Sequence, residues 1–241
     1  MAELHETYVR WLELENQALI DACRQDIAAL IPTCPGWTVL DLVSHHATFQ
    51  RWITEIITAR QLEPRAPAPS SPPDGADPID WYRSIGRDLI HVLRITDPDT
   101  NVWGVTNQQT VGAWARRQAS ETAVHRWDAQ NAVGRVTPIE HADDYILEMF
   151  DHLLPHLIAH FGALAPTGTI RLTSAIEQRS WTADSTADDR IITTGTDTTA
   201  DVMLSGTASD LFLALWSRPN AAHITGDETV LEQWSRAITG S

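Results

Sequence analysis

A change in hydrophobic periodicity divides the chain and limits its fold more than any other feature. Before about residue 166, apolar residues recur every three, four or seven positions over long stretches, which predicts amphipathic helices. After that point the segments are short, rich in threonine and partly alternating, which predicts strands. We therefore expect an α+β chain of two domains. Residues 1–165 would form a helical bundle, and residues 166–241 a small α+β domain with a short sheet and two helices.

Helix signals divide the first domain into several long segments joined by loops. Thr38 and Thr110 are expected N-cap residues, and Pro78 suits the first position of another helix. The sequence "TPIE", which starts at Thr137, reads as a capping box for a last helix with a kink at Pro155. Long helices joined in this way are typical of an up-down four-helix bundle. The expected helices cover residues 3–30, 39–60, 78–96, 110–132 and 138–161.

The second domain mixes strand and helix signals. A helix over residues 207–218 is expected to be capped by Thr207 or Ser209, and a closing helix covers 228–238. Short alternating segments between turn residues predict strands. The expected strands cover residues 168–175, 178–185, 189–195, 200–206 and 222–227.

Composition excludes several classes of function. The chain has 32 acidic and 17 basic residues, a net charge of −15, which disfavours nucleic-acid and anionic membrane partners. All of the basic residues are arginine, so Schiff-base chemistry and the lysine of a P-loop are excluded. The acidic, amphipathic start does not read as a signal peptide, and no run of apolar residues is long enough for a membrane span. Two cysteines without a C-x-x-C motif suggest a reduced, cytoplasmic setting.

The segment "RRQASETAVHRWDAQ" carries the first candidate site. Glu121 and His125 are four residues apart and share a helix face with Trp114. A solvated ion pair on a polar face is the simpler interpretation of this spacing, because E-x-x-x-H is a weak motif. The alternatives are a buried hydrogen bond and half of a metal site.

A second histidine occurs on the expected helix over residues 39–60. His45 shares a stripe with Phe49 and Trp52 and is expected to face the core. A lone histidine there is commonly a core residue, but bundles also build metal sites from facing helices. Two histidines and one carboxylate form a common catalytic zinc set. His46 points about 100° away on the helix and is the alternative ligand.

Longer motifs resemble a known family. The chain is similar to the actinobacterial mycothiol-dependent maleylpyruvate isomerase family, a branch of the DinB-like metal-binding four-helix bundles. The resemblance rests on "PTCPGWTVLDLVSHHATFQRW" and "RRQASETAVHRWDAQ" in the first domain. In the second domain, "GTASDLFLALWSR" and "ITGDETVLEQW" resemble the family's part that is related to sterol carrier proteins.

The resemblance implies a metal centre and thiol chemistry. His45, Glu121 and His125 match the family's ligands for Zn²⁺ or another divalent metal, although the family usually has an apolar residue at the position of His46. A zinc ion with open positions binds a small thiol, here expected to be mycothiol or a similar thiol, as thiolate. The thiolate then attacks a small electrophile, as in a cis-trans isomerase or an S-transferase. A metal-dependent hydrolase and a non-catalytic metal-binding or interaction protein are the alternatives. We expect a monomer or a small homo-oligomer.

Three arginines are weaker candidates for catalysis. Arg218 follows the apolar helix "LFLALW" and is suited to bind a substrate carboxylate in bidentate fashion; the alternative is a solvated arginine at a helix end. Arg83 and Arg87 lie on the expected helix over residues 78–96 and are further candidates.

Four other residues complete the candidate site. Trp37 and Trp114 are expected to line the pocket that binds the thiol cofactor. Asp128, three residues past His125, would orient that ring or face an arginine. Cys34 is either a reactive thiol or, in the simpler reading, a small buried hydrophobe.

Overall fold

The computed structural model divides the chain into two compact units. It describes residues 2–156, 166–174, 176, 178–184 and 199–239. One unit comprises Met1–Gly104 and Gln108–Thr137, and the other comprises Val105–Asn107 and Pro138–Ser241. Residues 138–156 therefore group with the second unit, and the division falls before the boundary near residue 165 that the hydrophobic pattern suggests. No helix among the described residues is long and apolar enough to cross a membrane.

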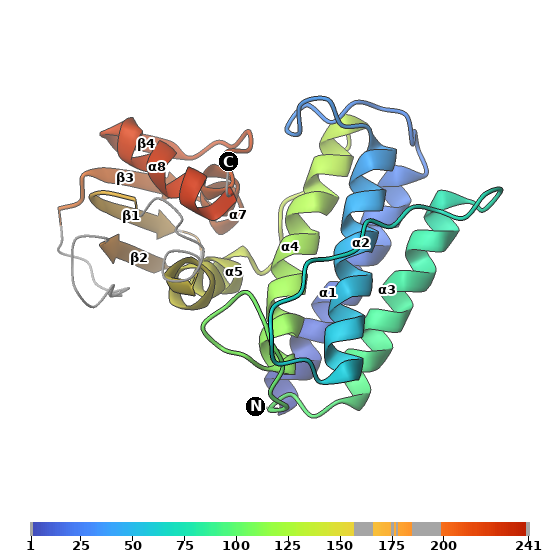
Figure 1. The fold of residues 1–241 in the computed structure, drawn as a ribbon. Coiled ribbons are helices and arrows are strands. Elements are labelled where there is room, and N and C mark those ends of the chain that lie inside the picture. Colours follow the sequence, from blue (N-terminus) through green and yellow to red (C-terminus); the bar gives the residue numbers. More distant parts are fainter. Residues whose placement is uncertain (1, 157–165, 175, 177, 185–198, 240–241) are drawn as a thin grey trace. The chain divides into compact units, whose positions relative to one another are not determined.

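The first unit is the expected up-down bundle of four helices (Figure 1). Thr38 and Asp41 form a complete capping box, and the Asp77 carboxylate accepts hydrogen bonds from the first turn of the next helix. Thr110 caps the last helix through its side chain. The helices are α1 (Ala2–Cys23), α2 (Val39–Ala59), α3 (Pro78–Ile95) and α4 (Val111–Ala132).

The first helix ends earlier than the sequence predicts. It stops at Cys23, and the helix expected to run to residue 30 is wrong over its last two turns. The Asp26 carboxylate accepts a hydrogen bond from the backbone N–H of Ala28, which stabilises a turn in place of a further helical turn. Leu30, which lies within the range expected to be helical, is 70% exposed and forms a β-bridge with Thr38.

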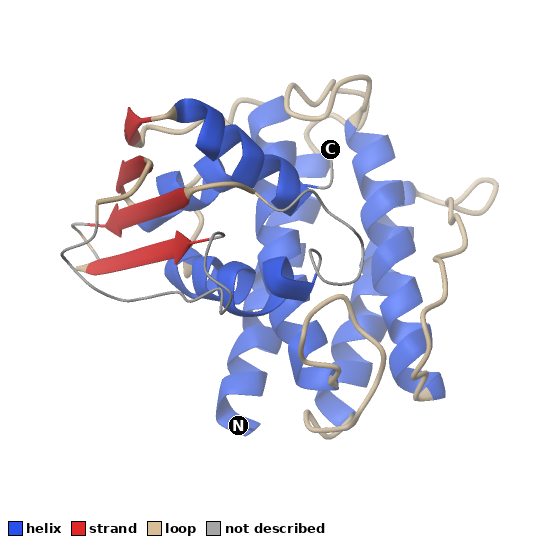
Figure 2. Ribbon diagram, turned by 60° about the vertical axis from the view of Figure 1, so that its left-hand side comes forward, coloured by secondary structure: helices blue, strands red, loops and turns tan. Residues whose placement is uncertain are grey.

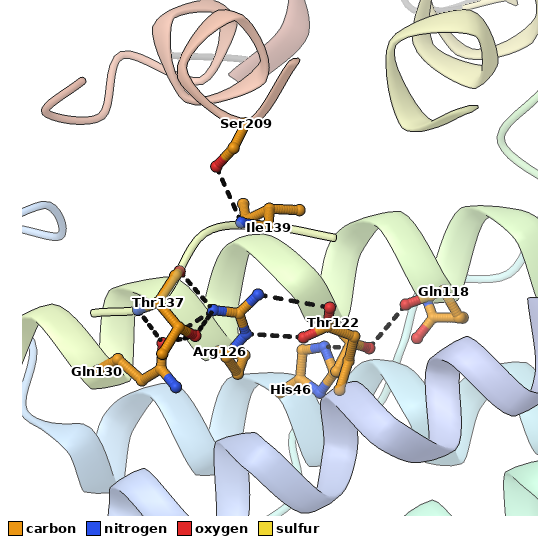
Figure 3. Close-up of polar contacts among 9 residues, drawn as sticks. His46, Gln118, Thr122, Arg126, Gln130, Thr137, Ile139 and Ser209 are labelled. Atoms are coloured by element: carbon orange, nitrogen blue, oxygen red, sulfur yellow. Dashed lines mark hydrogen bonds and ion pairs between the residues drawn. The ribbon is translucent and has the colours of Figure 1, made fainter. Parts of the chain in front are cut away.

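A buried ion pair joins α1, the first helix of the bundle, to α4, the last. Arg126 of α4 donates from Nε to Glu15 Oε2 of α1 at 2.7 Å, and both residues are buried. Its Nη1 also donates to Gln130 Oε1 at 2.8 Å and to the Thr137 carbonyl at 2.9 Å (Figure 3). These contacts satisfy a guanidinium that burial would otherwise destabilise. They fix the register of α1 against α4.

The same ion pair explains why the predicted capping box at Thr137 is wrong. The Thr137 hydroxyl contacts Arg126 and Gln130 instead of capping a helix. The next helix, α5 (Ala142–Glu148), starts after His141, which is left-handed and makes no side-chain cap. α5 belongs to the second unit, where the Tyr145 and Phe212 rings contact each other at 5.7 Å.

The helix expected over residues 138–161 is interrupted before Pro155. A π-helical segment, η1 (Met149–Leu153), follows α5 directly. Proline lacks an N–H group, so Pro155 cannot donate the regular helical hydrogen bond to the carbonyl of Asp151, four residues earlier. Asn107 Nδ2 donates to that carbonyl at 2.9 Å. Residues 154–156 are helical, and the remainder of the expected helix lies outside the described residues.

Among the described residues, the second unit holds a four-stranded sheet with two further helices (Figure 2). The strand order is β2-β1-β3-β4; β1 and β3 are parallel, and the other two pairs are antiparallel. Ile170, Leu172, Val202 and Leu204 are buried and alternate with more exposed residues along β1 and β3, as predicted. The expected strand over 189–195 lies outside the described residues. The elements are β1 (Thr169–Ser174), β2 (Arg179–Asp184), β3 (Val202–Gly206), α7 (Ala208–Leu215), β4 (His223–Gly226) and α8 (Glu228–Thr239).

Two details of this unit follow from single residues. Thr207 is the N-cap of α7, as predicted, and Ser209 Oγ instead accepts a hydrogen bond from the Ile139 backbone N–H at 2.9 Å (Figure 3). Gly226 has a φ of +98°, and a Cβ there would lie 2.2 Å from the Asp201 carbonyl oxygen. Only glycine fits this position.

Removal of one partner of the buried ion pair should be costly. Glu15→Ala leaves the Arg126 charge buried without its carboxylate, so we expect the free energy of unfolding to fall by about 3 kcal/mol or more. Urea denaturation followed by circular dichroism measures this change. Arg94→Ala is the matched control: Arg94 pairs with Glu6 and Glu13 at the surface, and its loss should cost less than about 1 kcal/mol. Equal losses in the two variants would contradict the assigned role of Arg126.

Candidate functional site

Helix α4 carries polar residues on faces that the bundle buries. This arrangement differs from α2, whose buried residues are mainly aliphatic and aromatic. Buried polar and charged groups are costly without partners, so they must pair with one another inside the bundle. The buried polar residues of α4 are Arg117, Gln118, Ser120, Thr122, His125, Arg126 and Asp128.

Four of the α4 side chains form a ladder of alternating charge. Arg117 contacts Glu121 Oε2 one turn further along the helix. The other carboxylate oxygen, Oε1, lies 3.3 Å from His125 Nε2. His125 Nδ1 lies 3.3 Å from Asp128 Oδ2, and Asp128 is completely buried. The imidazole of His125 is therefore held between two carboxylates.

The ladder controls the protonation of its members. Burial lowers the pKa of His125, but the hydrogen bonds and charges of Asp128 and Glu121 outweigh it and raise the pKa to about 9. Burial raises the pKa of Glu121, but the charge of Arg117 and the hydrogen bond of His125 hold it well below its usual value. At neutral pH the metal-free site thus holds an imidazolium between two carboxylates.

Helix α2 places two neighbouring histidines beside His125. The ring of His45 lies 5.6 Å from that of His125, and the ring of His46 lies 5.4 Å from it, measured between centroids. His45 is half-buried between Trp37 and Phe49, with ring centroids 4.9 and 4.8 Å away. Burial, followed by the charge of His125, lowers the pKa of His45 to about 4. His45 is therefore a neutral ring at physiological pH.

The two α2 histidines differ in their hydrogen bonds. His46 Nδ1 lies 2.9 Å from the Tyr82 hydroxyl, and its Nε2 lies 3.4 Å from Thr122 Oγ1. The Thr122 hydroxyl also donates to the Gln118 carbonyl at 2.7 Å (Figure 3). Both nitrogens of His46 are thus engaged. Among the described residues, no hydrogen-bond partner lies within reach of the His45 ring, which leaves its nitrogens available.

Two side chains of the ladder have the separation expected between ligands of a divalent ion. Two ligands of a tetrahedral zinc, each about 2.0–2.1 Å from it, lie about 3.4 Å apart. The separation of 3.3 Å between His125 Nε2 and Glu121 Oε1 fits this edge. In the described part of the chain, however, no group of three or more His, Cys, Asp or Glu side chains has the arrangement of a complete metal site. The pair fits two corners of such a site, and His45 is the neighbouring nitrogen donor with free ring atoms.

The bundle is similar to a known protein domain. The model of the family described as the mycothiol maleylpyruvate isomerase N-terminal domain matches residues 15–130. These residues span most of α1 to α4 and contain the ladder. Over these residues the bundle is similar to this domain. No significant match is found among curated protein sequences.

Two solved structures share the fold of the whole chain. They are crystal structures of a mycothiol-dependent maleylpyruvate isomerase and of a histidine-to-alanine mutant of it. Each has a TM-score of 0.56, is 13% identical, and aligns over 92% of this chain and 92% of its own. At this identity the likeness establishes the fold, including the α+β part that follows the maleylpyruvate isomerase N-terminal domain.

An aromatic cluster of the bundle extends from the histidines. Phe49, which contacts His45, also contacts Trp52 at 5.8 Å. Trp52 in turn packs against Trp103 and Trp114 at 5.3 and 5.8 Å, and Trp114 Nε1 donates to the Trp103 carbonyl at 2.8 Å. The predicted candidates Trp37 and Trp114 thus both belong to one aromatic cluster that includes the His45 ring.

None of the three arginines predicted as catalytic candidates is a member of the ladder. Arg83 pairs with Asp80, and Arg87 is exposed on α3. No hydrogen bond or ion pair among described residues joins either to Glu121 or His125. Arg218 lies in the second unit, where it donates to the Trp216 carbonyl at 2.8 Å and its guanidinium lies 6.0 Å from the Trp216 ring centroid.

Sequence reasoning missed two features of the bundle. Arg117 is the partner of Glu121, and its i,i+4 spacing was the available signal. The Tyr82 hydroxyl that hydrogen-bonds to His46 lies 36 residues away in the sequence, and no local sequence pattern predicts this contact. Cys34 is half-buried against the hydrophobic core, close to the simpler of its two predicted roles, and its sulfur lies 4.0 Å from Asp128 Oδ2.

The proton on His125 gives a direct test of the ladder. In metal-free protein, His125 should lose its proton near pH 9, whereas His45 should stay neutral down to about pH 4. A cation that binds His125 must displace this proton, so metal affinity should rise with pH up to about 9. Nitrogen-15 NMR of the histidine rings in chelator-treated protein measures both values.

Asp128→Asn is the matched variant for this titration. It keeps the shape of the side chain but removes the charge, so burial should then dominate and the pKa of His125 should fall. If wild-type His125 titrates at or below its ordinary value of about 6.5, the ladder does not have the assigned charges.

Proposed function

We propose that this chain is a metal-dependent thiol enzyme of the maleylpyruvate isomerase type. The observation that carries the proposal is the pair His125 Nε2 and Glu121 Oε1, separated by 3.3 Å inside a bundle of the matching domain family. The related crystal structures bear the name of a mycothiol-dependent maleylpyruvate isomerase, which supports a small thiol as cosubstrate. The second substrate is then a small electrophile with a conjugated double bond.

The metal would be held by His45, Glu121 and His125, and zinc suits two imidazoles and one carboxylate best. When bound with an open position, zinc lowers the pKa of a coordinated thiol, which is otherwise mostly protonated at neutral pH. The chain contributes the orientation of these ligands. Asp128 holds Nδ1 of His125 so that Nε2 faces Glu121, and Arg117 holds the other oxygen of that carboxylate.

The reaction needs no net proton transfer. The thiolate sulfur forms a bond to one carbon of the double bond, and the electron pair of that bond moves to the conjugated carbonyl oxygen. Rotation about the resulting single bond follows, and reformation of the double bond expels the thiolate. Retention of the sulfur adduct with uptake of one proton would instead make the chain an S-transferase.

The remaining chain residues would bind the substrates. We assign Trp37 and Trp114, which belong to the aromatic cluster around His45, to the wall against which the thiol cosubstrate packs. Arg218 is the best-suited arginine to bind a substrate carboxylate in bidentate fashion. Arg83 and Arg87 are weaker choices, because Arg83 already pairs with Asp80 and Arg87 is exposed.

Ligand substitutions test the metal centre. Purified wild-type protein should carry about one zinc ion per chain, and Glu121→Ala and His125→Ala should lose most of it while remaining helical. His91→Ala, which removes an exposed histidine of α3, is the matched control and should keep full occupancy. Metal analysis by mass spectrometry and circular dichroism are the measurements.

The two neighbouring histidines are separated by the same assay. His45→Ala should lose zinc, whereas His46→Ala should retain it because Tyr82 and Thr122 already occupy that ring. The reverse result would move the ligand from His45 to His46 and leave the rest of the centre standing.

Thiol dependence tests the reaction class. With maleylpyruvate as substrate, turnover should require both added mycothiol and bound metal, and chelation should abolish it. Cys34→Ser should keep most of the activity, because the attacking sulfur comes from the cosubstrate. Full turnover in thiol-free buffer would reject the proposal in favour of a hydrolase that activates water.

A further inference from the structure

The connection between α1 and α2 is a tightly bonded loop beside the site. We call residues 31–38 the PTCPGW loop. Within it, the Ile31 N–H donates to the Trp37 carbonyl at 2.9 Å, and the Trp37 N–H donates to the Cys34 carbonyl at 3.0 Å. Gly36 adopts a φ of +83°, which lets the chain turn back without strain. The loop is therefore a defined structure and not a loose linker.

One side chain of the loop reaches the buried end of the ladder. Thr33 Oγ1 donates to Asp128 Oδ1 at 2.6 Å, across 95 residues of sequence. The other oxygen of the same carboxylate, Oδ2, faces His125 Nδ1 at 3.3 Å. A carboxylate held at one oxygen cannot rotate freely, so Thr33 fixes the direction in which Asp128 meets the imidazole.

A second side chain of the loop reaches the other histidine. The Trp37 ring lies 4.9 Å from the His45 ring at 59°, and Phe49 closes the opposite side at 4.8 Å. This sandwich restricts rotation of a ring that has no hydrogen-bond partner among the described residues. One loop thus contacts both the carboxylate beside His125 and the ring of His45.

We propose that the PTCPGW loop is a positioning element for the metal centre, with Thr33 acting through Asp128 on His125 and Trp37 acting directly on His45. This inference rests on the proposed metal ligands. It assigns a role at the site to Thr33, which lies far from His125 in the sequence. Orientation of a ligand histidine by a carboxylate is worth about 10–100-fold in metal affinity, and loss of the group that holds the carboxylate should cost a similar factor.

A pair of variants isolates the Thr33 hydroxyl. Thr33→Val keeps the shape of the side chain but cannot donate, and Thr33→Ser keeps the donor. We expect Thr33→Val to weaken zinc binding about tenfold or more, measured by competition with a chromophoric chelator, while Thr33→Ser stays close to wild type. Thermal unfolding by circular dichroism shows whether both variants keep the fold.

Nitrogen-15 NMR of metal-free protein separates this inference from the proposed function. The Nδ1–H resonance of His125 should be protected from exchange in wild type and Thr33→Ser, and should broaden in Thr33→Val. If wild type binds no zinc, the metal proposal fails, and this resonance alone decides the role of Thr33. Equal zinc affinity and equal His125 resonances in both variants would overturn the inference even if zinc binds.

Discussion

The site depends on a single constraint: one imidazole lies between two carboxylates inside a helical bundle. Buried charges are stable only when paired, so Glu121, His125 and Asp128 each require the next. Arg117 completes the series at one end and Thr33 at the other. α4 therefore turns a polar face inward. The Arg126–Glu15 pair holds α1 against that helix on another of its faces.

Much of the bundle follows from local sequence signals. Thr38 with Asp41, Pro78 after Asp77, and Thr110 all act within one turn, so the sequence alone predicts where α2, α3 and α4 begin. The signals failed where a distant group competed for the same residue. Thr137 resembles a helix cap, but Arg126 binds it and no helix begins there. α1 ends at Cys23 although the apolar pattern continues, and the Asp26 carboxylate stabilises a turn there.

The candidate site divides in the same way. The spacing of Glu121 and His125 predicts a shared face, and the rings of both His45 and His46 lie close to that of His125. Spacing alone could not choose between His45 and His46, because the choice depends on Tyr82, which comes from another helix. Nor could it find Thr33, since hydrogen bonds between distant segments leave no periodic trace. Arg218 belongs to the second unit and stays a proposal about the substrate.

X-ray absorption at the zinc edge tests the central claim most directly. Native protein should give a first shell of nitrogen and oxygen at about 2.0–2.1 Å with imidazole scattering from two histidines. Added mycothiol should introduce one sulfur at about 2.3 Å, and His45→Ala should remove one imidazole contribution. A zinc shell that contains no imidazole, or one that gains no sulfur when mycothiol is added to active protein, would contradict a thiol-binding metal centre on His45, Glu121 and His125.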